Sequence, residues 1–229
     1  MIYVGLDDTD NERSRGTGHL SRMLAQELQP QYEVRGITRH QLLLDPRVPY
    51  TAKNSCATLH LNGNGSTDLA ALTKQVMAFV WKHSAQGSDP AICVAQHVPP
   101  EASDFGHRAQ RCVIAQVDAR RLAQDHDITL VGLGGTEDGV IGALAAVGLA
   151  ATGQDGRFIS LGTVRELDGD QPVEAILESG VAEVRDLEGH RISSGVVATE
   201  GRLRPAFRES RAILYVRRNG TCWLPVKLD

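Results

Sequence analysis

The first ten residues restrict the fold of this chain more than any other segment of that length. Ile2–Leu6 is an apolar, partly β-branched run that ends abruptly in Asp7-Asp8-Thr9-Asp10. This pattern predicts a short buried strand whose C-terminal end carries three carboxylates. Like charges this close raise one another's pKa and favour a bound cation, and Mg²⁺ is the natural one because it combines carboxylate ligands with water and phosphate oxygens. On the acids alone, the alternative that Asp7, Asp8 and Asp10 are caps and solvated turn residues stays equally open.

A glycine-containing loop follows the acids. Leu20, Leu24 and Leu28 recur at helical spacing, so a helix is predicted to begin near Gly18, within the run Arg15-Gly16-Thr17-Gly18-His19. Free backbone amides at such a helix start can bind an anion, although many helices simply begin after glycine. Lys53 and Asn54 stand at a second turn before a strand, where they reach either an anion or only solvent. The candidate nucleotide-binding residues are Thr9, Gly16, Gly18, His19, Lys53 and Asn54.

The length of 229 residues exceeds the common size of one domain, roughly 100–150 residues, so we expect two domains. A composition with 41% hydrophobic but only 4% aromatic residues predicts a core of small aliphatic side chains, which suits α/β or α+β packing. In the first domain, residues 1–120, strands are predicted at 32–44, 55–61, 91–96 and 112–117, and a helix at 68–83. The second domain, residues 121–229, is predicted to contain a strand at 128–133, a helix at 138–151 and a hairpin turned by Asn219-Gly220.

A second glycine-rich stretch, Gly132–Gly139, also joins a predicted strand to a predicted helix. It does not match the dinucleotide fingerprint, because Glu137 stands where GxGxxG requires glycine, and it lacks the Gly-Lys-Ser/Thr ending of a Walker loop. Glu137 and Asp138 would also place negative charge at the helix start, in competition with phosphate. We therefore expect a structural connector in which Thr136 caps the helix.

Composition excludes several classes of protein. A net charge of −4 excludes a uniformly basic nucleic-acid binder. The four cysteines form no CxxC pair and the eight histidines no HExxH motif, which argues against a zinc enzyme and favours buried free thiols. No stretch approaches the roughly 20 consecutive apolar residues of a membrane span, and no basic signal segment precedes the acids. We therefore expect a cytoplasmic protein without a membrane partner.

The order of these motifs resembles that of a known enzyme family. Val4-Gly5-Leu6-Asp7-Asp8-Thr9-Asp10, followed by an Arg-Gly loop, resembles the N-terminal kinase-like domain of archaeal tRNA-isoleucine 2-agmatinylcytidine synthetase (TiaS). Asp45–Asn54 is similar to that family's proline-containing segment, and Gly139–Gly148 is similar to the opening helix of its next, ferredoxin-like domain. Members also carry an OB-fold module and a zinc ribbon, whereas this chain has no CxxC pair, so we expect only the first portion of the longer enzyme.

The resemblance implies a kinase-like α/β domain at 1–120, a ferredoxin-like α+β domain at 121–229, and an activity. The family uses ATP to phosphorylate a tRNA cytidine and then replaces the phosphate with agmatine, which implies a Mg²⁺/ATP-dependent phosphotransferase acting on RNA or a nucleotide-like small molecule. Carried over by the motif, Asp7, Asp8 and Asp10 are expected to ligate Mg²⁺, with Asp8 and Asp10 also catalytic. Thr17 is the hydroxyl nearest to the family's autophosphorylated threonine and is the third catalytic candidate. The alternative function is a non-catalytic nucleotide-binding or RNA-associated subunit that acts with a partner protein.

Overall fold

The computed structural model describes residues 1–51, 53–63, 67–199, 201 and 203–228 of the chain. Its contacts divide the chain into two compact units, Met1–Thr152 and Gly153–Asp229. Each unit contains its own cluster of buried apolar side chains. The chain is a mixed α/β protein whose strands pair mostly in the antiparallel sense.

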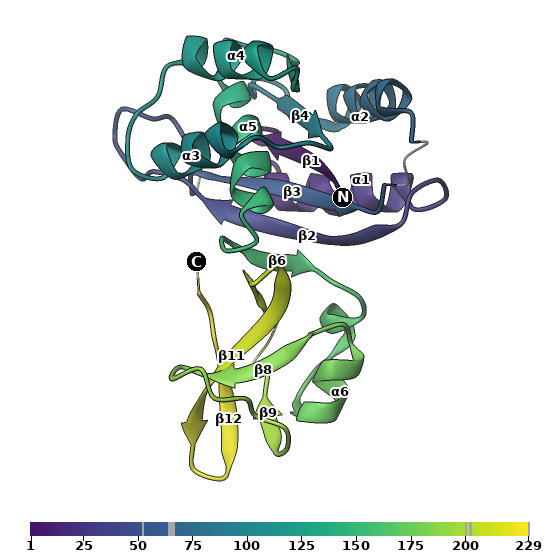
Figure 1. Cartoon of the computed structure of the whole chain (residues 1–229), viewed down its shortest axis with the longest axis vertical. Helices are drawn as coiled ribbons and strands as arrows, with labels where there is room; N and C mark the ends of the chain where they lie inside the picture. The colour runs from purple at the N-terminus through teal and green to yellow at the C-terminus, as the bar shows by residue number, and fades with distance from the viewer. Residues whose placement is uncertain (52, 64–66, 200, 202, 229) are drawn as a thin grey trace. The chain divides into compact units, whose positions relative to one another are not determined.

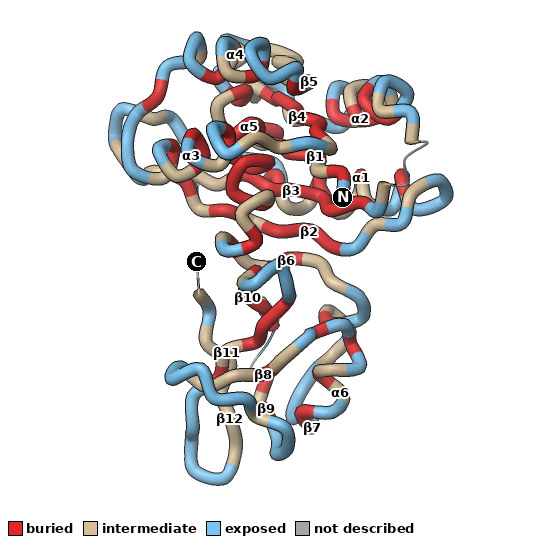
Figure 2. Tube along the Cα trace, in the orientation of Figure 1, coloured by how far each residue is buried: buried red, intermediate tan, exposed pale blue. Residues whose placement is uncertain are grey.

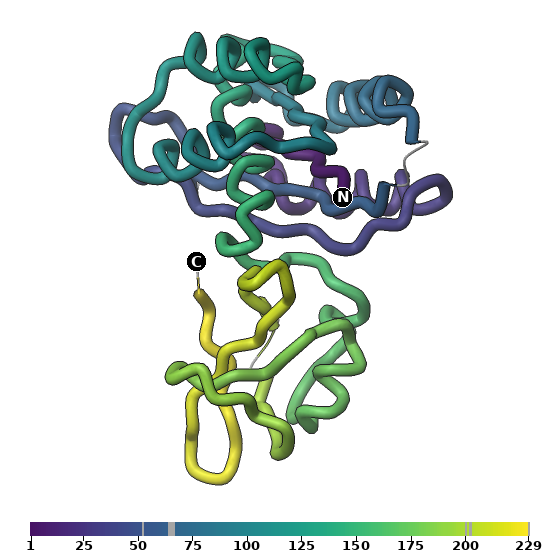
Figure 3. Tube along the Cα trace, in the orientation of Figure 1, coloured from purple at the N-terminus to yellow at the C-terminus, as the bar shows by residue number. Residues whose placement is uncertain are grey.

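Five antiparallel strands form the sheet of the first unit. They are β1 (Ile2–Asp7), β2 (Val34–Gln41), β3 (Ser55–Leu61), β4 (Ala91–Ala95) and β5 (Thr129–Gly132). They lie in the order β5-β4-β1-β3-β2, and each neighbouring pair is antiparallel. The predicted strand at Ile2–Leu6 is confirmed and is central, because β3 and β4 pair with its two sides (Figure 3).

The first four strands and two helices follow one another in the order βαββαβ. Helix α1 (Thr17–Leu28) joins β1 to β2, and helix α2 (Leu69–His83) joins β3 to β4. Together with the strand order β4-β1-β3-β2, this is the split βαβ arrangement of ferredoxin-like folds. The ferredoxin-like arrangement that we expected at 121–229 therefore lies within residues 2–95. Local sequence patterns do not reveal this, because the arrangement is defined by which strands pair.

Helices cover both faces of this sheet. Helix α5 (Gly139–Ala151) packs on β1, β3 and β4, and α3 (Pro100–Ala109) packs on α5 (Figure 1). Gly5 of β1 faces α5, since a Cβ atom there would lie 2.3 Å from the carbonyl oxygen of Ala143. The alternating residues Ile2, Val4 and Leu6 therefore face the other side, where α1 and α2 lie. The buried trace in Figure 2 accordingly runs through β1, β3 and α5.

The boundary between the units falls after Thr152 rather than after residue 120. The predicted helix at 138–151 is α5, but it belongs to the first unit because it packs against the first sheet and α3. Small residues make this packing close: a Cβ atom at Gly148 would lie 1.9 Å from the carbonyl oxygen of Ala102 on α3. The sequence similarity of this helix to the start of a new domain therefore does not coincide with a structural boundary.

The predicted strand at 112–117 does not form. Residues 112–115 are a loop, and α4 (Gln116–Asp125) begins directly after it. Ile114 is buried in the core, whereas Val113 and Val117 are exposed. A loop followed by a helix start gives the same short apolar pattern as a strand, so periodicity alone does not separate the two. The preceding helix α3 was not predicted at all.

Strand β11 (Arg211–Asn219) is the central strand of the second unit. It pairs with β10 (Ala206–Arg208) and β12 (Cys222–Val226) in the antiparallel sense and with β8 (Glu183–Asp186) in the parallel sense. The other elements are β6 (Arg157–Ser160), the 3₁₀ turn Val164–Glu166, β7 (Asp170–Pro172), α6 (Val173–Glu178) and β9 (Val196–Ala198). The predicted hairpin is confirmed, with Gly220 at a φ of 58° between β11 and β12.

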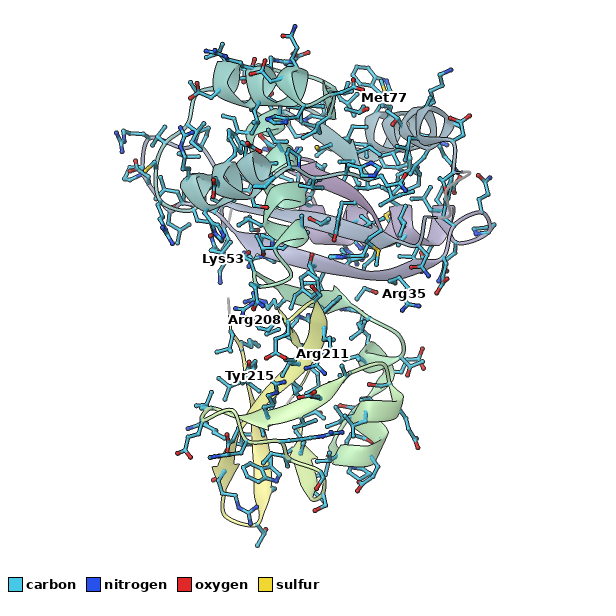
Figure 4. The ribbon with its side chains drawn as sticks, viewed as in Figure 1. Arg35, Lys53, Met77, Arg208, Arg211 and Tyr215 are labelled. Atoms are coloured by element: carbon cyan, nitrogen blue, oxygen red, sulfur yellow. The ribbon has the colours of Figure 1, made fainter. Side chains whose placement is uncertain are left out.

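Charged side chains cross-link the second unit. Arg185 donates to Glu183 at 2.7 Å and to Glu209 at 2.6 Å, and Arg211, labelled in Figure 4, also donates to Glu209 at 2.6 Å. The two guanidinium groups lower the pKa of Glu209 to about 2. These arginines are therefore engaged in the fold of the unit.

Two further sequence expectations concern thiols and membrane spans. Cys56 and Cys93 are buried free thiols as predicted, but Cys112 is exposed because its segment is a loop rather than a strand. Among the residues that the structure describes, none of the helices combines the length and the apolar character that a membrane crossing needs.

Candidate functional site

One edge of the first sheet gathers the ends of all five strands. β1, β2 and β5 end at this edge, and β3 and β4 begin there, because every neighbouring pair is antiparallel. The segments that leave or enter the strands at this edge include Asp8, Leu42, Asn54, Asp89 and Asp138. Residues far apart in the sequence therefore meet at one place in the first unit.

These segments enclose a pocket of about 500 Å³. Such a volume lies within the range of small-molecule sites, roughly 300–1,000 Å³. The described lining combines acidic, cationic and apolar side chains. The acids are Asp7, Asp8, Asp10, Asp89 and Asp138, the cations are Arg47 and Lys53, and the apolar residues include Leu42, Leu43, Val48, Val113, Ile114 and Ile141. A ligand that carries both a charged and an apolar part fits such a lining.

Asp7 and Asp8 are crowded carboxylates at the end of β1. Burial, together with the neighbouring charge of Asp8, raises the pKa of Asp7 to about 7. Burial and the nearby charge of Asp89 raise the pKa of Asp8 to about 6. Asp8 also has a left-handed φ of 49°, which is costly for a residue with a side chain. The mutual raising of carboxylate pKa values that we expected from the sequence is therefore present at this edge.

Asp10 has a different role in the geometry. One of its oxygens accepts from the Thr17 backbone N–H at 3.1 Å and from the Thr17 hydroxyl at 2.9 Å. The other accepts from the Thr51 hydroxyl at 2.8 Å. Asp10 therefore fixes the start of α1 and ties the proline-containing segment to it.

Two backbone amides at the start of α1 already have hydrogen-bond partners within the chain. The Thr17 amide binds the Asp10 carboxylate, and the His19 amide donates to the carbonyl of Gly16 at 2.7 Å. Two of the amides that we expected to bind phosphate are thus used within the loop. Thr17 lines the pocket but is only 7% exposed, and its hydroxyl also accepts from the Thr9 hydroxyl at 3.2 Å. The pocket lining does not include Thr9, Gly16, Gly18 or His19.

The turn before β3 does reach the pocket. Lys53, labelled in Figure 4, is an exposed lining residue. Asn54 also lines the pocket and donates to the carbonyl of Leu43 at 2.7 Å. The side chain of Asn54 therefore stabilises the loop between β2 and β3. The nearby Arg47 pairs with Asp45 at 2.8 Å, which lowers the pKa of Asp45 to about 2.

The same pocket is lined by three residues that were not selected from the sequence as site residues: Asp89, Gln116 and Asp138. Asp89 precedes β4 and accepts from both the backbone N–H and the hydroxyl of Thr136. Asp138 directly precedes α5, and its carboxylate accepts from the side chain of Gln116 at 3.1 Å. The stretch at 132–139 is therefore more than the connector we expected: Thr136 binds Asp89, and neither Thr136 nor Asp138 caps the helix through its side chain. The glycine residues made this stretch noticeable in the sequence. Its contribution to the pocket depends on the pairing of β5 with β4, which the sequence pattern does not show.

The predicted Mg²⁺ ligands do not form one three-ligand set. Within the described residues, the ligand atoms that gather within 4.8 Å of one another are those of Asp186, Glu188 and His190 in the second unit. Asp10 is turned toward Thr17 and Thr51 instead of toward Asp7 and Asp8. The donor set at the pocket nevertheless fits Mg²⁺, which commonly uses one or two protein carboxylates and fills its remaining positions with water and phosphate oxygens.

Comparison with known proteins gives a consistent relationship. No protein-family model matches the chain. The chain is 26% identical over 153 residues to the tRNA(Ile2) 2-agmatinylcytidine synthetase TiaS of Thermococcus sibiricus and 28% identical over 151 residues to that of Methanocorpusculum labreanum. Each match covers 64% of this chain and 35% of the relative, so the chain matches about a third of the length of these relatives.

Solved structures agree with the sequence matches. A complex of TiaS with tRNA(Ile2) and ATP aligns with a TM-score of 0.56 at 24% identity, over 64% of this chain and 36% of that one. Apo TiaS aligns with a TM-score of 0.53 at 23% identity, over 64% and 35% of the two chains. These scores show a shared fold over the matched portion. Over the matched portion, the chain is therefore similar to TiaS in sequence and in fold.

Proposed function

We propose that this chain is a cytoplasmic, Mg²⁺/ATP-dependent phosphotransferase related to the kinase portion of TiaS, whose acceptor is RNA or a nucleotide-like small molecule. The observation that carries the proposal is the carboxylate-lined pocket at the strand ends, in which Asp7 and Asp8 have raised pKa values. The unit Met1–Thr152 would be the catalytic part. ATP is a component of one solved TiaS complex, and this supports nucleotide as the ligand here.

The proposed metal site consists of Asp7 and Asp8, with Asp89 and Asp138 beside them. A bound Mg²⁺ would neutralise phosphate charge and orient the phosphates for transfer. The four carboxylates would hold the ion directly or through water. We infer that Asp10 and Thr17 act by positioning the loop, because their polar atoms bind each other.

The rest of the pocket supplies what an ATP molecule needs. The first turn of α5 lines the pocket at Gly139 and Gly142. Because Glu137 and Asp138 place negative charge at this helix start, phosphate would be held there through the bound Mg²⁺. Lys53 adds a cation at the mouth. Leu43, Val113 and other apolar lining residues would contact the base. Catalysis would then rest mainly on positioning and charge neutralisation.

Calorimetry tests this function. The purified chain is titrated with ATP in the presence of Mg²⁺ and then in EDTA, and ADP formation is measured with RNA and nucleosides as acceptors. We expect ATP to bind much more weakly in EDTA and ADP to form only with an acceptor. Equal affinity in both buffers, or no binding, would refute the proposal.

A non-catalytic nucleotide-binding or RNA-associated subunit is the second candidate function. It is favoured by one observation, which is that the hydroxyl of the catalytic candidate Thr17 is hydrogen-bonded to Asp10 in a residue that is only 7% exposed. In the same experiment it predicts Mg²⁺-dependent ATP binding without ADP formation until a partner protein is added.

A further inference from the structure

Gln116 is a polar residue at the pocket that the proposed metal and phosphate sites do not use. It is the first residue of α4, and its side-chain amide reaches the segment before α5. Its Nε2 donates to the carbonyl oxygen of Thr136 at 2.8 Å and to the carboxylate of Asp138 at 3.1 Å. One amide therefore joins α4 to both the backbone and the acidic side chain of this segment.

The orientation of this amide is fixed from the other side. Arg120, one turn later on α4, donates from Nε to Gln116 Oε1 at 3.0 Å. An arginine side chain can only donate, so the oxygen of the amide must face Arg120 and the nitrogen must face Thr136 and Asp138. Arg120 also pairs with Glu137, whose φ of 64° is left-handed. The amide is thus held with its two donors directed at the segment before α5.

The Asp138 carboxylate is the group whose position depends on this amide. This residue occupies the N-cap position of α5 but makes no side-chain cap bond, so the helix does not fix its carboxylate. Gln116 supplies the bond instead, and Asp138 lines the same pocket as Asp8, where a Cβ atom on its chain neighbour Gly139 would lie 3.3 Å from the Cβ atom of Asp8. Without Gln116 the Asp138 carboxylate would be free to rotate away from the pocket.

We propose that Gln116 is a positioning residue that holds the Asp138 carboxylate in place beside Asp8, and that Arg120 sets the orientation of its amide. This inference rests on the proposed function, since it assigns Asp138 to the surroundings of the cation. Residues that orient metal-binding carboxylates typically change metal affinity by about 10–100-fold when they are replaced. The effect should appear in the cation dependence of nucleotide binding and not in the stability of the free protein.

The test compares Gln116→Met, which keeps the length of the side chain but removes both donors, with Gln124→Met, an exposed glutamine on the same helix. Mn²⁺, used as a paramagnetic probe for Mg²⁺, is titrated into protein with ATP and followed by electron paramagnetic resonance. ATP affinity in EDTA and the thermal midpoint of the unliganded protein are measured alongside. We expect Gln116→Met to weaken Mn²⁺ binding by about tenfold or more, with both other quantities unchanged. Gln124→Met should match the wild type.

Arg120→Met provides an intermediate case, because it leaves the Gln116 donors but removes the group that orients them. We expect it to weaken Mn²⁺ binding by less than Gln116→Met. Wild-type Mn²⁺ affinity in Gln116→Met would overturn the inference while leaving the proposed function intact. Absence of Mn²⁺-dependent ATP binding in the wild type would instead refute the proposed function itself. A loss of thermal stability in Gln116→Met that matches its loss of Mn²⁺ affinity would also overturn the inference, since Gln116 would then be structural.

Discussion

Replacing Asp7 by asparagine should stabilise the unliganded protein and weaken its binding of Mg²⁺-ATP. Asp7 is a half-buried carboxyl against α5, and a Cβ atom at Gly142 would lie 1.7 Å from its Oδ2. Its ionised form is disfavoured by burial and by Asp8. Asparagine has nearly the same shape and no charge, so the substitution removes the electrostatic cost while keeping the packing.

The size of the effect follows from the pKa of Asp7, which is raised from 3.8 to about 7. A change of about 3 in pKa corresponds to at most about 4 kcal/mol, at about 1.4 kcal/mol for each pH unit. Because the folded pKa is the higher one, the folded protein keeps its proton while the unfolded chain loses it, and stability falls as pH rises from 3.8 to 7. Allowing for relaxation around the site, we expect Asp7→Asn to gain about 2 kcal/mol at pH 8 and close to nothing at pH 4.

Urea unfolding at pH 4, 6 and 8 in EDTA measures this gain directly. Asp104→Asn is the matched control, because Asp104 is an exposed carboxylate on α3 outside this pocket. It should show no gain that grows with pH. Calorimetry on the same samples should show Mg²⁺-ATP affinity reduced by at least tenfold in Asp7→Asn. A variant that is destabilised at pH 8, or stabilised without loss of binding, would refute this account of the site.

Four other outcomes are expected. Asp10→Ala should have the opposite sign from Asp7→Asn and lower the unfolding free energy by about 1–2 kcal/mol in urea, since two hydrogen bonds at the start of α1 and one from Thr51 are lost. Burial lowers the pKa of His60 from 6.5 to about 3, so the wild type should lose on the order of 4 kcal/mol of stability as pH falls through that window, and urea unfolding of His60→Gln should show a flatter acid limb. Gly142→Ala should reduce Mg²⁺-dependent ATP affinity at least tenfold by calorimetry, because the added methyl group displaces Asp7. The chain alone should not form agmatinylated tRNA, judged by mass spectrometry of the nucleosides, because a net charge of −4 and 4% aromatic residues provide little RNA-binding surface.

Local patterns predicted the elements that have strong periodicity. The strand at the N-terminus, the helices beginning at Thr17 and Leu69, and the final hairpin all form as expected. The predicted strand at 112–117 was wrong, since an apolar loop leading into a helix has the same short pattern. The domain boundary depends on which sheet α5 covers, and that is a tertiary contact that no local pattern encodes.

Only the acids that follow the first strand could be predicted from the sequence as part of the candidate site. Asp7 and Asp8 follow a strong strand signal, so their place at a strand end could be deduced. Asp89, Asp138 and Gln116 join them because β4 and β5 are added beside β1, and α4 follows an unpredicted helix. The glycine loop was expected to bind phosphate, but Asp10 satisfies its amide, a pairing that depends on how the loop folds back.

Protection of Cys112 from alkylation tests whether ATP and Mg²⁺ bind in this pocket. This thiol is exposed and lines the pocket, whereas Cys56 and Cys93 are buried and Cys222 lies in the second unit. Alkylation by N-ethylmaleimide is followed at each cysteine by peptide mass spectrometry, with Mg²⁺-ATP, with ATP in EDTA and without nucleotide. We expect Mg²⁺-ATP to slow labelling of Cys112 at least tenfold, ATP in EDTA to slow it far less, and labelling of Cys222 to be unaffected. Equal labelling of Cys112 under all three conditions, at nucleotide concentrations that saturate binding in calorimetry, would contradict this expectation.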